Sequence, residues 1–454
     1  MSLKEPNIIL VIIDTLRNGI INFQQLKYDN VPFFKDFTIY ENCVAPAPWT
    51  IPSHASIFTG KYPSEHGIHE DRDHQVSSIN LDDFFPTKLE YSTIFQKLKK
   101  KGYTNYGITR NISIRPGTVF ERGFDVFQYF DFPFSQQQYS VLLSKLSEEF
   151  GEATKKEIIS RMIKAGRIRE LANLYNTKRR VERLADRFNF PSEKGASYVV
   201  ETIKNTSLLK PFSLFLNLME MHEPYPTPIH LYDQYKELIS NERMNLNKVN
   251  KIRKEYSAQG EQVKNFLIAF FTHLKGMNEW DNTLIIVTSD HGQSLWENGF
   301  GGHGTFLYNE LVKVPLLIKY PKREFGRADN NRVCSSVDLF ALMDSISSED
   351  NYELIPSEVA FSESFGILHN MSSALNHKSS AEGERLRKAI ESIDFRRISA
   401  FKGNMKLTLN TLTGEIIEYL ENSKPAEINP KIIKESAIID DIEIFDSKIA
   451  IPFR

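Results

Sequence analysis

Ile8-Ile9-Leu10-Val11-Ile12-Ile13-Asp14 is a run of six apolar residues that stops abruptly at a carboxylate. The run is short and mostly β-branched, which is typical of a strand buried on both faces, as in a parallel sheet. Ligands of such sheets gather at the carboxyl ends of the strands. The sequence therefore predicts an α/β architecture and places Asp14 at its functional edge.

Further strand candidates alternate with helical patterns along the chain. The predicted strands are Tyr103–Thr109, Phe212–Leu218, Thr283–Thr288 and Val314–Tyr320, and the predicted helices are Thr93–Lys101, Lys194–Asn205, Gln262–Gly276 and Val337–Ile346. This alternation predicts a doubly wound fold, in which a central, mostly parallel sheet is flanked by helices.

Metal-competent side chains follow three of the predicted strands. Asp14, His222 and the pair Asp290-His291 each lie where an apolar run ends. Each residue alone is explained equally well as a cap or a loop residue. Together, Asp14, Asp290 and His291 offer two oxygen ligands and one imidazole, which suits one divalent cation: Mn²⁺, Zn²⁺, Ca²⁺ or Mg²⁺.

Thr50 lies in Trp49-Thr50-Ile51-Pro52-Ser53-His54, before a short predicted helix. We expect Pro52 at the first helical position and Gly60 at the residue that ends the helix. The helix start would attract an anion, so the Thr50 hydroxyl could attack a phosphate or sulfate ester. The alternative is an ordinary threonine N-cap.

The second half of the chain indicates a separate unit. Phe395–Leu420 has short alternating strands with turn residues between them, which predicts a small antiparallel sheet. We therefore expect a catalytic domain over 1–350 and a C-terminal subdomain over 351–454, with a loop at His369–Gly383. A helical insertion is predicted at about 136–188. Its segment Lys155–Arg187 carries eleven Lys/Arg against four Asp/Glu, which indicates solvated helix faces or a lid that attracts an anionic substrate.

Composition narrows the class of protein. The 454 residues are 41% hydrophobic and 25% charged with a net charge of −2, so nucleic acid is not an expected partner. Two distant cysteines, Cys43 and Cys334, make a disulfide framework unexpected. The sequence contains no run of about 18 apolar residues, so we expect no membrane span. No signal peptide is apparent, and the expected location is the cytoplasm. The oligomeric state stays open.

The ordered motifs resemble the sulfatase family, within the alkaline phosphatase superfamily. The matching segments are Asn7–Arg17, Trp49–Gly67, Pro211–Tyr225, Asn282–Gly292, Gly302–Ile318 and Arg397–Leu407. The resemblance implies the fold of that family, with Thr50 as nucleophile and as a ligand of the metal. It also implies roles for His222 and Arg110 in holding the ester, for His303 in protonating the leaving group, and for His54 at the position of a family arginine.

The departures from the family pattern bear on the reaction. Most sulfatases have Cys or Ser at the position of Thr50 and oxidise it to a formylglycine, which threonine cannot form because its Cβ carries a methyl group. Thr15 replaces a second Asp, and Asp290-His291 replaces Asp-Asn. These differences favour a hydrolase of phosphate, phosphodiester or phosphonate esters. A sulfatase without formylglycine and a phosphotransferase to an acceptor hydroxyl are the alternatives. The expected substrate is a small or glycan-linked anionic ester.

Overall fold

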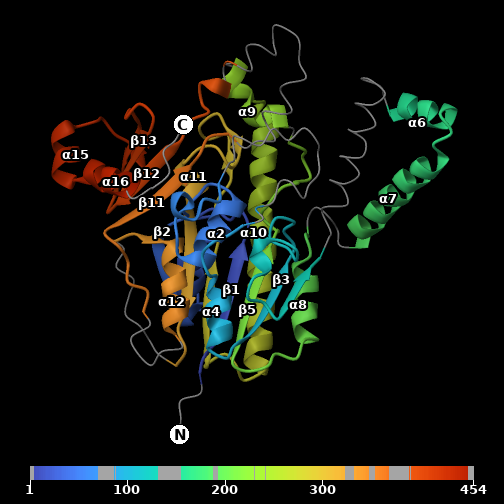
Figure 1. Ribbon diagram of the computed structural model, residues 1–454, viewed down its shortest axis with the longest axis horizontal. Coiled ribbons are helices and arrows are strands. Elements are labelled where there is room, and N and C mark those ends of the chain that lie inside the picture. The colour runs from blue at the N-terminus through green and yellow to red at the C-terminus, as the bar shows by residue number, and fades with distance from the viewer. Residues whose placement is uncertain are drawn as a thin grey trace.

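The computed structural model (Figure 1) describes most of the chain. The described residues are 5–69, 86, 88–130, 155–187, 193–229, 231–240, 242–322, 332–346, 353–367, 388 and 390–447. The predicted loop at His369–Gly383 and the first part of the helical insertion, 136–154, lie outside these ranges, as does residue 188.

The central sheet has eight strands in the order β10-β2-β9-β6-β1-β5-β3-β4. Their bounds are β1 Asn7–Ile13, β2 Thr38–Val44, β3 Thr104–Thr109, β4 Val126–Tyr129, β5 Phe212–Leu218, β6 Thr283–Thr288, β9 Lys313–Lys319 and β10 Cys334–Ser335. All neighbouring pairs are parallel except those that β9 forms with β2 and β6. The predicted mostly parallel sheet is confirmed.

The apolar run Ile8–Ile13 forms most of β1, an interior strand of this sheet. β1 pairs with β5 on one side and with β6 on the other, and all seven of its residues are buried. Ile9, Val11 and Ile13 enter one core, and Ile8, Leu10 and Ile12 enter the other. The strand is therefore buried on both faces, as its composition predicts.

Helices cover both faces of the sheet (Figure 1). α8 Ala196–Lys204 and α10 Leu246–Gly276 share a core with one face, and α2 Thr50–Thr59, α4 Ile94–Lys100 and α12 Leu339–Ser345 share the core of the other. The predicted helix at Gln262–Gly276 is the second half of α10. Further helices of this part of the chain include α1 Phe23–Tyr28, α3 Pro63–His66, α9 Leu231–Ser240 and α11 Asn309–Val312.

The start of α2 differs from the prediction. Trp49 is the N-cap, with an extended backbone, and Thr50 is already the first helical residue. Pro52 is the third helical residue, not the first, because a proline is tolerated throughout the first turn, where no carbonyl awaits its missing N–H. Thr50 is therefore not an N-cap. Gly60 ends the helix at φ +68°, as expected.

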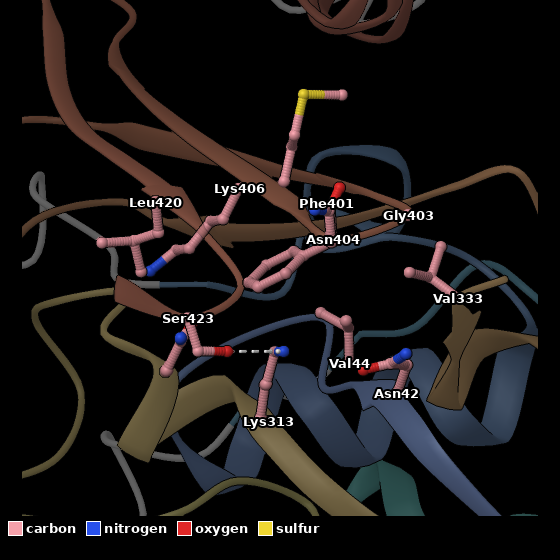
Figure 2. A pocket seen from close by; sticks show the side chains of 12 residues that line it. Asn42, Val44, Lys313, Val333, Phe401, Gly403, Asn404, Lys406, Leu420 and Ser423 are labelled. Atoms are coloured by element: carbon pink, nitrogen blue, oxygen red, sulfur yellow. Dashed lines mark hydrogen bonds between the residues drawn. The ribbon is translucent and has the colours of Figure 1, made fainter. Parts of the chain in front are cut away.

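The C-terminal sheet has the order β11-β12-β13-β14-β15 and is antiparallel. Its strands are β11 Val359–Ser364, β12 Arg397–Lys402, β13 Met405–Asn410, β14 Ile416–Glu421 and β15 Lys424–Pro425, and the helices α15 Pro430–Ser436 and α16 Ile438–Ser447 follow. Figure 2 shows a small pocket between this sheet and the central sheet, where Lys313 donates to Ser423 Oγ at 3.2 Å. The predicted meander is confirmed, and the domain boundary near 350 stays a prediction.

The basic part of the insertion is helical, as expected. α6 Lys155–Lys164 and α7 Ile168–Arg187 lie beside the main body, connected through a left-handed Gly166 (Figure 1). Within the described ranges, no helix has both the length and the apolar composition that crossing a bilayer requires.

Candidate active site

Three predicted metal ligands meet at the carboxyl edge of the central sheet. Asp14 follows β1, and Asp290 and His291 follow the neighbouring β6. One ligand atom from each lies within 4.8 Å of the others, and all three side chains are fully buried. Parallel pairing of β1 with β6 brings together residues that are about 276 positions apart in sequence.

The donor atoms of this cluster fit a cation. Asp14 Oδ1 and Asp290 Oδ2 are buried without a hydrogen-bond partner among the described residues. His291 Nδ1 lies 2.8 Å from the carbonyl oxygen of Gly292, which can only accept, so His291 Nδ1 carries the hydrogen. His291 Nε2 then presents its lone pair to the carboxylates, 3.5 Å from Asp290 Oδ2. Two unpaired carboxylate oxygens and one imidazole lone pair are a donor set for one divalent cation.

Asp14 is electrostatically strained in the absence of a cation. Burial raises the pKa of Asp14 well above its usual range, and the nearby Asp290 carboxylate raises it further. A hydrogen bond of 2.6 Å from Asn111 Nδ2 to Asp14 Oδ2 opposes these effects. Two carboxylates buried this closely are stable as anions only when a positive charge lies between them.

The hydroxyl of Thr50 lies directly beside this cluster. Thr50 Oγ1 is 3.3 Å from Asp14 Oδ2 and 3.3 Å from His291 Nε2. Thr50 is 7% exposed, whereas the three proposed ligands are fully buried. Of these four residues, Thr50 is therefore the one with measurable exposure.

His222 and His303 lie on the solvent side of the cluster and are half-buried. Their ring centroids are 5.1 Å apart, and the His303 ring is 4.7 Å from that of His291. His303 Nδ1 donates to Gln293 Oε1 at 2.7 Å, and His222 Nδ1 donates to the Glu223 carbonyl at 2.7 Å. Burial lowers the pKa of His222 to about 4 and that of His303 well below its usual value. Both rings are therefore neutral at pH 7 before a substrate binds.

His54 lies beside the cluster, with Nδ1 3.5 Å from Asp290 Oδ2, whereas Arg110 is buried against Gly195. His54 is fully buried and donates from Nδ1 to the Thr50 carbonyl oxygen at 3.0 Å, while Asn217 donates to His54 Nε2 at 3.2 Å. His54 thus fixes the backbone that carries Thr50. The buried guanidinium of Arg110 packs on Gly195, where an added Cβ would lie 2.1 Å from Arg110 Nη1.

A buried lysine beside the site is absent from the sequence-based prediction. Lys194 Nζ donates to the carbonyl oxygen of Glu220 and to Gln259 Oε1, each at 2.8 Å. Desolvation lowers the pKa of Lys194 from 10.5 to about 7, against the attraction of Glu220, Glu223 and Asp14. Lys194 lies two residues before α8 in a stretch with no distinctive motif, so only its tertiary contacts with Glu220 and Gln259 indicate its position. Asn111 and Gln293 were missed for the same reason.

We expect Lys194→Met to destabilise the protein and to change its pH dependence. The loss leaves two buried acceptors unsatisfied, at a cost of about 1–3 kcal/mol. A buried lysine with a lowered pKa binds fewer protons in the folded than in the unfolded chain between about pH 7 and 10.5, so its contribution to stability rises with pH there. Urea unfolding at pH 7 and pH 9 should show the stability gap between wild type and Lys194→Met widening in favour of wild type at pH 9. Lys248→Met, which removes a half-buried lysine of α10 that pairs with Asp233, is the matched control.

Comparison with known proteins identifies the family of this chain. The sulfatase family profile matches residues 6–343, about three quarters of the chain. The chain belongs to the sulfatase family. A sulfatase of Formosa agariphila is 25% identical over 358 residues, which cover 71% of this chain and 66% of that protein. An uncharacterized sulfatase of Escherichia coli, YidJ, is 29% identical over 90 residues, which cover 19% and 18%. The matches thus span less than two thirds of the length of these relatives.

Solved structures of sulfatases and phosphonate monoester hydrolases share the fold. A 2-O GAG sulfatase superposes with a TM-score of 0.62 at 13% identity, covering 98% of this chain and 93% of that one. The phosphonate monoester hydrolase of Silicibacter pomeroyi superposes with a TM-score of 0.58 at 13% identity, covering 97% and 95%. These neighbours confirm the predicted fold.

Proposed function

We propose that this sulfatase-family chain is a metal-dependent ester hydrolase that uses Thr50 as its nucleophile on phosphate, phosphodiester or phosphonate esters. The observation that carries the proposal is the position of Thr50 Oγ1, 3.3 Å from both Asp14 Oδ2 and His291 Nε2 in the first turn of α2. A threonine that only begins a helix does not require contacts with both a buried carboxylate and a metal-competent histidine, whereas a nucleophile bound to a cation does. Phosphonate monoester hydrolases are among the structural neighbours, so this fold is compatible with the hydrolysis of phosphorus esters.

Asp14, Asp290 and His291, with Thr50 Oγ1, would hold one Mn²⁺, Zn²⁺, Ca²⁺ or Mg²⁺. When bound there, such a cation lowers the pKa of a coordinated hydroxyl and polarises an oxygen of the ester. The Thr50 hydroxyl loses its proton to solvent as its oxygen attacks phosphorus, and the bond from phosphorus to the alcohol oxygen breaks, with the alcohol leaving as it takes a proton from His303. The helix start at Thr50 and the half-buried His222 face the remaining ester oxygens, where negative charge develops. Water then attacks the Thr50 ester and releases the acid.

His303 is the proposed acid that protonates the departing alcohol. The ring is neutral before substrate binds, because burial and two neighbouring histidines lower its pKa. The negative charge of a bound ester raises the pKa of His303, so the ring gains the proton that it later donates from Nε2. Gln293 Oε1 accepts from His303 Nδ1 and keeps Nε2 as the exchanging atom.

A sulfatase without formylglycine is the second candidate, because the family profile and the relatives in Formosa and Escherichia are sulfatases. A threonyl sulfate would require direct attack of water, since Thr50 cannot expel sulfate by reverting to an aldehyde. A panel of matched nitrophenyl esters, namely a phosphodiester, a phenylphosphonate and a sulfate, separates the two. Turnover of the phosphorus esters without the sulfate supports the proposal, and the reverse overturns it. Transfer to an added alcohol in preference to water would identify a phosphotransferase.

We expect His303→Gln to act mainly on esters with poor leaving groups. Loss of a general acid lowers rates by about 10²–10⁴-fold, but a leaving group of low pKa departs without a proton. The ratio of kcat/KM for phenyl and nitrophenyl esters of one acid should therefore fall steeply in His303→Gln. Glu297→Gln, near the same edge but paired with Arg17, is the matched control and should keep the wild-type ratio. An equal loss on both esters would remove the assignment of His303 as the acid.

A further inference from the structure

The only two cysteines of the sequence lie opposite one another in the central sheet. Cys43 of β2 and Cys334 of β10 are register partners in a parallel pair, although 291 positions separate them in sequence. Neighbouring strands lie about 4.7–4.9 Å apart, and a disulfide joins Cα atoms that are about 4.4–6.8 Å apart. The backbone spacing of this pair is therefore within the range of a disulfide.

Both thiols point to the same side of the sheet. Cys43 and Cys334 are buried in one core, together with residues of α2, α4 and α12. The Cys334 thiol interacts with that of Cys43, and this interaction together with burial raises the pKa of Cys334 well above its usual value. The remaining polar neighbours are weak: Cys43 Sγ is 3.8 Å from Ser336 Oγ, and Cys334 Sγ is 3.7 Å from the Asn42 carbonyl oxygen. Nothing in these contacts holds the two sulfur atoms apart.

We propose that Cys43 and Cys334 form a reversible disulfide that joins β10 to β2. The reaction is thiol–disulfide exchange with a small disulfide such as oxidised glutathione. One cysteine thiolate attacks the glutathione disulfide and releases one glutathione thiolate, and the second cysteine thiolate displaces the other. Two cysteine protons are lost, the protein sulfurs are oxidised and two glutathione thiols are formed.

The position of β10 gives the oxidant a route to these buried thiols. β10 is a strand of two residues at the end of the sheet order, so it can open locally without disruption of β1, β5 and β6. The closed loop would contain about 290 residues, and the constraint on the unfolded chain grows with loop length. The disulfide should therefore stabilise the folded protein.

The disulfide would also steady the helix that carries Thr50. Cys334 leads directly into the 3₁₀ turn Ser336–Asp338 and then into α12. The ring of Phe340 in α12 packs on Gly60, which ends α2, so that an added Cβ at Gly60 would lie 2.9 Å from the ring. Oxidation would thus fix β10 to β2. Because β10 continues into α12, whose Phe340 packs on Gly60, this would restrict the motion of the last turn of α2.

The test compares reduced protein with protein incubated with oxidised glutathione in urea below the unfolding transition. After denaturation, maleimide labelling should count two thiols in the reduced sample and none in the oxidised one, whose mass should be lower by two hydrogens. Peptide mapping should join the segments that contain Cys43 and Cys334. The oxidised protein should also melt several degrees higher, and this shift should be absent in Cys43→Ala and in Cys334→Ala.

Two thiols that persist after oxidation, a stable glutathione adduct, or a disulfide between two chains would each overturn the proposal. The thiol count and the peptide map are measured on the wild-type protein, so they do not depend on how the alanine variants fold. They are also independent of ester hydrolysis, so the proposed function and the disulfide fail or succeed separately.

Discussion

Thr50→Ala should lower kcat/KM for the preferred ester by at least about 10³-fold, because the substitution removes the attacking oxygen together with a ligand of the cation. The alanine side chain fits the first turn of α2, and the Thr50 carbonyl that His54 contacts belongs to the backbone, so the fold should persist. Steady-state kinetics on the same esters measure the loss, and thermal unfolding checks the fold.

Thr50→Ser is the matched control because it keeps the hydroxyl and removes one methyl group. It should retain activity within about tenfold of wild type. Rapid quenching followed by mass spectrometry should find one added phosphoryl or phosphonyl group on Thr50 in wild type and none in Thr50→Ala. Wild-type activity in Thr50→Ala would exclude Thr50 as the nucleophile, whatever the substrate.

Asp14→Asn should abolish activity and the stabilisation by metal, so that the order of stability of wild type and variant without metal reverses when metal is added. In wild type, a cation at 100 times its Kd should stabilise the fold by about 2.7 kcal/mol, and a chelator should remove this gain. Without metal, Asp14→Asn should be more stable than wild type, because the amide relieves the repulsion between Asp14 and Asp290 that raises the pKa of Asp14. Addition of metal should then stabilise wild type and leave the variant unchanged.

Thermal unfolding with and without metal, together with metal analysis after reconstitution, measures this reversal. Asp440→Asn replaces an exposed carboxylate of α16 and should respond to metal as wild type does. A metal content near zero in reconstituted wild type, with Asp14→Asn and wild type melting alike, would remove the metal from the proposed function.

The sequence predicted those features that local patterning encodes. The run Ile8–Ile13 is typical of a strand buried on both faces, and the polar residues that end parallel strands share one edge of the sheet. This reasoning was sufficient to bring Asp14, Asp290 and His291 together before the structure placed them within 4.8 Å. The alternation of strands in Phe395–Leu420 predicted the C-terminal meander in the same way.

The missed features depend on tertiary contacts. β2 mixes exposed, half-buried and buried residues and is interrupted by an irregularity between Tyr40 and Cys43, so its pattern is not that of a regular strand. The sequence predicts the start of α2 at Pro52, two residues later than the structure shows, because Pro52 fits any position of a first turn. Lys194 has the sequence context of a surface lysine, and only its contacts with Glu220 and Gln259 show that it is buried.

The order of strands in the central sheet sets a limit on when this protein can become active during its synthesis. β1 is the first strand made, yet both of its partners, β5 and β6, lie more than 190 residues further along the chain. At about 5–20 residues per second, β1 waits on the order of ten seconds or more for β5, and longer for β6. Until then, the six apolar residues of β1 lack the partner strands that bury them. A nascent or truncated chain therefore exposes this apolar segment and should depend on chaperones to avoid aggregation.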